Sequence, residues 1–185
     1  MEDNNATRIF GGKDATIHDY GKVYPGQTIH KDPTIQNVGT NDAWIAAKVT
    51  ITDGAGEIHK VVGYADYEGI DIELLLSGGL LDEKVHVGTW NGIQNVCFNE
   101  RYAMVQVPNA SEGRFEFYFF FLDKFEQTKE EVLFDALNIP IEWNNEEMQE
   151  FADFNIKIQA FASQTEGMGS CFEAMQKAFP DYFQF

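Results

Sequence analysis

Apolar and polar residues alternate along several short segments of this chain, and a period of two predicts β-strands. Four segments are predicted strands, residues 34–38, 44–51, 102–107 and 154–162: the first and the last alternate, and the other two are mostly apolar runs bounded by turn residues. Residues 39–42 form a polar turn between the first two of these strands. Residues 58–62 favour a further strand, whereas the pattern of residues 70–76 fits a strand or a short helix.

Residues 114–122 are the most aromatic segment of the chain. They alternate at first and then become continuously apolar, as in a strand that runs from a half-solvated edge into a covered interior. Such aromatic residues can form a platform for ligand stacking, but large aromatic side chains more often fill a core. We therefore expect a core strand here.

Glycine-containing pairs mark the turns. Pro25-Gly26 is a turn signal, and Asn91-Gly92 suits a tight two-residue hairpin. Gly11-Gly12 and Gly78-Gly79 are predicted to be turn glycines, because a phosphate-binding loop requires a helix that starts directly after the glycines.

Three short helices are predicted in the connections. Thr128 with Glu131 forms a capping box that predicts a helix over residues 132–137, and Ser170 with Glu173 forms a second one for residues 171–179. Asn144 or Asn145 is the expected cap of a helix over residues 146–151, whose acidic residues suit the positive end of the helix dipole.

Many short strands with a few short helices between them predict a mostly β fold, a jelly-roll-like two-sheet sandwich. We expect residues 1–22 to form an N-terminal arm or first strand and residues 23–185 to form one β-sandwich domain.

Charge narrows the classes of partner. The chain has 13 basic and 30 acidic residues, which gives a formal net charge of −17. Nucleic-acid binding is not expected, because its affinity comes largely from Lys and Arg that neutralise phosphates. Membrane insertion is not expected either, because no apolar run approaches the length of a span. Self-repulsion that favours solubility is the simplest reason for the acidity.

The residues of known catalytic motifs are missing from the sequence, so we expect a protein that is not an enzyme and needs no cofactor. His18, His30, His59 and His86 lie in separate segments, without the spacing of a helical zinc site. Residues 66–71 resemble the start of a calcium loop, but its glycine and its bidentate Glu positions are occupied by Asp71 and Ser77. A solvated acidic face is the preferred interpretation.

The two cysteines, Cys97 and Cys171, are far apart in the sequence and have no metal or redox spacing. Their separation permits one disulfide in an extracellular protein and equally permits two free thiols.

A more specific pattern covers most of the chain. Residues 24–39 and 42–49 combine a Pro-Gly turn, a strand entered through Lys-Asp-Pro, a polar turn and a returning apolar strand. In order and spacing, this pattern and several downstream segments resemble the TasA/camelysin family of exported biofilm-matrix proteins. The downstream segments are 125–128, 132–134, 138–140, 154–164 and Ala174.

This resemblance implies an extracellular jelly-roll subunit that assembles with copies of itself into fibres of a biofilm matrix. It also implies that an N-terminal strand of one subunit completes the sheet of the next, which physically is β-augmentation. The segments that correspond to this assembly arm are residues 6–10 and 15–17, with Arg8, Ile9, Phe10, Ala15 and Ile17 as the residues expected to carry it.

Two alternatives remain open. Camelysin-like members of the family are also described as metal-dependent proteases, although this sequence lacks a metal-binding helix with a general base. The other alternative is a phage structural protein that uses the same sandwich. The start of the chain, Met1 to Asn5, has no signal-peptide pattern, so export requires that the leader has been removed.

Overall fold

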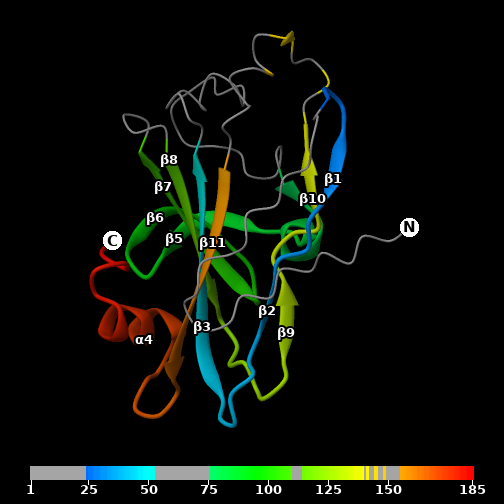
Figure 1. Cartoon of the computed structure of the whole chain (residues 1–185). Helices are drawn as coiled ribbons and strands as arrows, with labels where there is room; N and C mark the ends of the chain where they lie inside the picture. Colours follow the sequence, from blue (N-terminus) through cyan, green and yellow to red (C-terminus); the bar gives the residue numbers. More distant parts are fainter. Residues whose placement is uncertain are drawn as a thin grey trace.

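The computed structural model describes residues 24–52, 76–109, 114–139, 141, 144–145, 148 and 155–185 (Figure 1). In this part of the chain a six-stranded antiparallel sheet is covered on one face by two small antiparallel sheets and on the other by a helix. The predicted mostly β sandwich with short helices is therefore confirmed.

The strand order defines the layers. The large sheet runs β11 (Asn155–Gln164), β3 (Ala43–Thr52), β8 (Arg114–Phe121), β7 (Tyr102–Asn109), β6 (Ile93–Phe98) and β5 (His86–Trp90). The small sheets are β1 (Thr28–His30), β10 (Ala136–Asn138) and β4 (Leu76–Ser77), and β2 (Thr34–Gln36) with β9 (Glu130–Val132). A 3₁₀-helix, η1 (Gly79–Asp82), follows β4, and α4 (Cys171–Ala178) follows β11.

Strand β8 lies inside the large sheet and is covered on both faces. Phe117, Phe119 and Phe121 point into the core between the large sheet and the small sheets. Tyr118 and Phe120 belong to a second core beneath α4. Burial on both faces explains why the apolar run of this strand is continuous rather than alternating, and it confirms the prediction of a core strand.

Strands β1 and β2 form one long ribbon with β10 and β9. Thr28 pairs with Asn138 and Thr34 pairs with Val132, in the same antiparallel register on both sides of a break at residues 31–33. Backbone bonds bridge this break, from Lys31 N to Asp135 O at 2.9 Å and from Leu133 N to Pro33 O at 3.0 Å. The predicted strand 34–38 is thus real, but it pairs with β9 and belongs to a different sheet from its neighbour β3.

The predicted helix over residues 132–137 is wrong. Thr128 has a φ of 70°, which is not the extended conformation of an N-cap, and its N–H donates to Asn37 O at 2.9 Å. The following residues satisfy their backbone groups by pairing with β2 and β1 instead. A local capping signal is here overridden by long-range pairing that buries Leu133, Phe134 and Leu137.

The second predicted helix and its Ser170 cap are confirmed, although the Glu173 carboxylate accepts a hydrogen bond from Gly169 N at 2.9 Å and not from the N–H of the cap residue. Ser170 Oγ accepts a hydrogen bond from Glu173 N at 3.2 Å and α4 runs from Cys171 to Ala178. The chain after α4 then folds back over the sheet, where Phe183 is only 1% exposed. Its ring packs edge-on against Tyr118 and Phe161, at centroid distances of 5.5 and 5.0 Å.

The predicted turns are confirmed where the structure describes them. Asn91 and Gly92 have φ values of 47° and 82° and connect Trp90 to its partner Ile93, as in a type I′ hairpin. Gly78 and Gly79 also have positive φ, and a Cβ on Gly78 would lie 1.9 Å from Asp135 Oδ1. Several predictions lie outside the described residues, namely those for residues 11–12, 58–62 and 66–71. The same holds for most of residues 70–76 and 146–151.

Asn37 is the one polar side chain found buried in the described part of the chain, at 6% exposure. Its Nδ2 donates to Asn41 O at 2.9 Å and to Phe125 O at 2.8 Å, and its Oδ1 accepts from Gly39 N at 2.9 Å. The side chain therefore fastens the 38–42 turn and the chain after β8 to the end of β2.

We predict that Asn37→Ala lowers the free energy of unfolding by about 2 kcal/mol, because the buried Phe125 O loses its donor and two part-buried hydrogen bonds, to Asn41 O and from Gly39 N, are also lost. Urea denaturation followed by circular dichroism measures the change. Asn41→Ala, which removes an exposed side chain of the same turn, is the control and should change stability by less than about 0.5 kcal/mol. Equal effects of the two substitutions would contradict the role of the Asn37 side chain.

The two cysteines are not joined by a disulfide. They lie on opposite faces of the large sheet, with Cys97 against the core beneath the small sheets and Cys171 in the core beneath α4. Cys171 Sγ lies 3.0 Å from Ile45 O, and burial raises the pKa of its thiol to about 12.

Since a raised pKa keeps a thiol protonated below that value, Cys171 stays in the unreactive thiol form at pH 8. We predict that a thiol reagent at pH 8 modifies Cys97 in the native protein and modifies Cys171 only after unfolding. Mass spectrometry would give one fast modification in native conditions and two in urea. Fast native modification of Cys171 would show that α4 does not seal this site.

Candidate functional site

The outer strands of the large sheet are the first candidates for a site, because a sheet edge presents unpaired N–H and C=O groups that can bind another strand. In the described part of the chain the end strands of this sheet are β11 and β5. They differ in length and in the regularity of their pairing.

Strand β11 is a long and regular edge. Its ten residues pair one by one with β3, from Asn155 opposite Thr52 to Gln164 opposite Ala43, and no bulge shifts this register. In an antiparallel strand every second residue directs its backbone groups away from the partner, so half of these residues present theirs to the outer flank. No other described strand occupies that flank.

The side chains of β11 explain why it folds there. Ile156, Ile158 and Ala160 pack toward the core beneath the small sheets. Phe161 points to the other face, where its ring lies 5.2 Å from Phe179 and 5.0 Å from Tyr182. The predicted strand over residues 154–162 is confirmed with nearly the same bounds.

The opposite edge is short and irregular. Strand β5 has five residues, and its pairing with β6 shifts register between Gly88 and Trp90. A bulge of this kind twists an edge and interrupts its ladder of backbone groups, which is a common protection of natural edge strands.

The residues predicted to form the assembly arm, Arg8, Ile9, Phe10, Ala15 and Ile17, lie outside the described residues. The structure therefore describes a possible acceptor for a strand and leaves the donor as a prediction.

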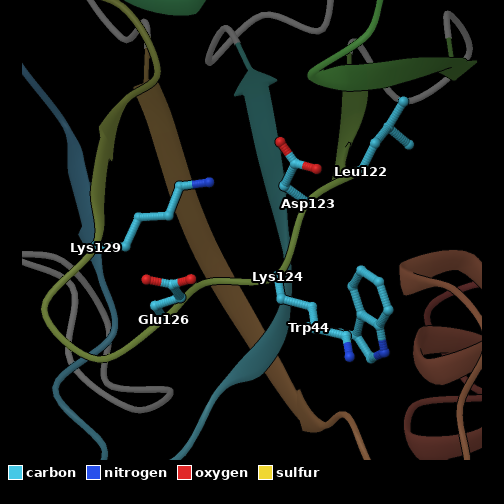
Figure 2. Close-up of a pocket in the computed structure, with 6 residues that line it drawn as sticks. All are labelled: Trp44, Leu122, Asp123, Lys124, Glu126 and Lys129. Atoms are coloured by element: carbon cyan, nitrogen blue, oxygen red, sulfur yellow. The ribbon is translucent and has the colours of Figure 1, made fainter.

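A shallow depression near the start of β3 is the second candidate. It has a volume of about 470 Å³ and is lined by Trp44, Leu122, Asp123, Lys124, Glu126 and Lys129. Figure 2 shows Lys124 beside the indole of Trp44, with Glu126 and Lys129 on the other side. Lys124 Nζ lies 5.6 Å from the Trp44 ring centroid, and Lys129 Nζ lies 4.9 Å from that of Phe125.

These side chains do not form a catalytic arrangement. The depression is lined by neither His, Cys, Ser nor Thr, so it has no nucleophile beside a base. Its two lysines pack on aromatic rings and lie among two carboxylates, Asp123 and Glu126. The Trp44 indole N–H has no hydrogen-bond partner, but this atom is buried and is closed to a ligand from solvent. The depression is therefore best described as the surface of the segment that connects β8 to β9.

Among the residues that the structure describes, no three His, Cys, Asp or Glu side chains come together as a possible metal site. His30 and His86 lie on different sheets, whereas His18 and His59 fall outside the described ranges. In the same part of the chain, no helix has the length and apolarity needed to cross a membrane.

One half-buried charge pair was not predicted from the sequence. Lys48 Nζ lies 2.7 Å from Glu116 Oε1, with the two side chains 15% and 13% exposed. Tyr118 Oη donates to Glu116 Oε2 at 3.1 Å, and the Lys48 ammonium lies 5.3 Å from the Tyr118 ring centroid. These contacts satisfy both charges within the protein, so the pair holds β3 to β8 and is not a free catalytic dyad.

Comparison with known proteins gives no relative: no family model, no curated protein and no solved structure matches this chain. The case for a function therefore rests on the chain's own residues.

The edge position of β11 was also missed by sequence reasoning. A period of two identifies a strand but not its neighbours, because strand order depends on the whole topology. One signal was available: residues 155–164 contain Lys157 and no acidic residue, in a chain with 30 acidic residues.

Proposed function

We propose that this protein is a structural subunit that assembles with copies of itself into an extracellular fibre or matrix, and that it is not an enzyme. The observation that carries the proposal is the long, regular outer edge of β11, to which a strand of another subunit can add by main-chain hydrogen bonds. Three further observations support the same proposal: the resemblance to the TasA/camelysin family, the sandwich architecture, and a sequence without the known catalytic motifs.

In this proposal the arm around Arg8, Ile9 and Phe10, extended by Ala15 and Ile17, is donated to the next subunit. Repetition of one head-to-tail contact produces an open filament rather than a closed ring, provided that its rotation does not close. The jelly-roll subunit would then be a rigid unit, and the arm would be the connector.

The high negative charge gives assembly a dependence on salt. A formal charge of −17 on each subunit opposes the approach of the next, and raising the ionic strength from about 0.01 M to 0.15 M shortens the screening length from about 30 Å to about 8 Å. Assembly by neutral main-chain contacts should therefore become faster as salt is added.

We predict that the full chain forms concentration-dependent filaments in negative-stain microscopy at 0.15 M salt and markedly fewer at 0.01 M. A variant that lacks residues 1–19 should remain monomeric in both, and its circular dichroism spectrum serves as the folding control. Filaments that form equally well without residues 1–19 would rule out the arm as donor. A full chain that stays monomeric at all concentrations would rule out the fibre.

A metal-dependent protease is the competing function, and it is tested separately. Metal analysis of the purified protein and a casein assay with and without chelator decide between the two. Bound metal together with chelator-sensitive proteolysis would replace the structural proposal.

A further inference from the structure

We propose that Asn91 is a site of spontaneous deamidation, which converts it into isoaspartate and aspartate at the tip of the β5–β6 hairpin. This inference is independent of the proposed function, because it follows from the chemistry and the surroundings of the Asn91-Gly92 pair. The modification affects the core beneath α4, since both strands of this hairpin contribute side chains to that core.

Deamidation joins groups of two neighbouring residues, and asparagine is among the thermolabile residues of proteins. The backbone nitrogen of Gly92 loses its proton and attacks Cγ of Asn91, the Cγ–Nδ2 bond breaks, and the side-chain nitrogen leaves as ammonia. The product is a five-membered succinimide ring that contains the Gly92 nitrogen. Water then opens the ring: cleavage on the Cγ side gives aspartate, and cleavage on the side of the main-chain carbonyl gives isoaspartate.

Both reacting groups are accessible at this pair. Asn91 and Gly92 are exposed, and a Cβ placed on Gly92 would meet no atom within 4 Å. In a two-residue hairpin the flanking residues, here Trp90 and Ile93, pair across the loop. Within the described part of the chain, no hydrogen bond holds the Asn91 carboxamide or the Gly92 N–H. A local opening of the tip is therefore enough to bring the Gly92 nitrogen to Cγ.

Two nearby asparagines lack this combination. Asn99 Oδ1 accepts hydrogen bonds from Arg101 N and Tyr102 N at 2.8 and 2.9 Å. Asn95 is exposed and also has a positive φ of 58°, but the residue after it is Val96. A β-branched side chain shields the attacking nitrogen, whereas glycine leaves it open. Asn95 is therefore an internal control on the same hairpin.

The two products differ in their effect on the hairpin. Aspartate leaves the main chain unchanged, and an Asp-Gly pair suits a type I′ turn as well as Asn-Gly does. Isoaspartate routes the main chain through Cβ, which adds one atom to a two-residue turn and disturbs the pairing of Trp90 with Ile93. The Trp90 ring centroid lies 5.1 Å from those of Phe120 and Phe172, so this change loosens the cover of the core beneath α4.

Peptide mass spectrometry of the ageing protein tests this proposal. The full chain is kept in mildly basic buffer for several weeks and then cut after Lys84 and Arg101, which releases one peptide with Asn91, Asn95 and Asn99. Deamidation makes this peptide heavier by one mass unit, and fragmentation locates the change. A methyltransferase specific for isoaspartate labels that product. The Asn91→Asp variant and a sample unfolded in guanidinium chloride are aged in parallel.

We expect the native protein to deamidate at Asn91 at least about tenfold more than at Asn95, because the valine after Asn95 shields the attacking nitrogen. The isoaspartate label is strong in the aged full chain and markedly weaker in aged Asn91→Asp. In thermal unfolding followed by circular dichroism, the aged full chain gains a less stable fraction that grows with its isoaspartate content. Fresh Asn91→Asp unfolds as the fresh full chain does.

The opposite results are equally clear. An unchanged Asn91 in the native protein, beside rapid deamidation in the unfolded sample, would show that the turn protects the pair and would overturn the proposal. Absence of deamidation in both samples would do the same. Equal deamidation of Asn91 and Asn95 would overturn the role assigned to Gly92. Isoaspartate without loss of thermal stability would overturn the effect on the core beneath α4.

Discussion

Burial of β8 on both faces is the constraint on which the rest of the structure depends. A strand with aromatic residues pointing both ways is stable only if each face is covered, and each cover comes from a different part of the chain. The β1–β2 and β9–β10 ribbon covers Phe117, Phe119 and Phe121. Helix α4 and Phe183 cover Phe120 on the opposite side.

This arrangement places the center of the sheet deep in the molecule, with β11 and β5 as its outer strands in the part of the chain that the structure describes. Strands β3 and β7 protect the two sides of β8, and β11 is the outer neighbour of β3. Because β11 is held to β3 along ten residue pairs, it is a rigid edge rather than a loose one. A rigid acceptor loses little conformational entropy when a strand adds to it, which favours assembly.

The sequence predicted the local elements better than their partners. The strands around Trp44 and Phe161, the Asn91-Gly92 hairpin and the Ser170 cap depend on neighbouring residues, so short-range patterns were sufficient to find them. The helix predicted from the Thr128 capping box does not form, because the residues after Thr128 pair with β2 as strand β9. The Lys48–Glu116 pair and the edge position of β11 depend on strand order, which alternation cannot supply.

Hydrogen–deuterium exchange of the monomer and of assembled protein tests the central claim most directly, because it reports which backbone groups become protected on assembly. If β11 accepts a strand, the outward amides of residues 155–164 exchange quickly in the monomer and slowly in filaments, while residues 86–90 of β5 change little. Filaments in which residues 155–164 exchange as fast as in the monomer would contradict the claim.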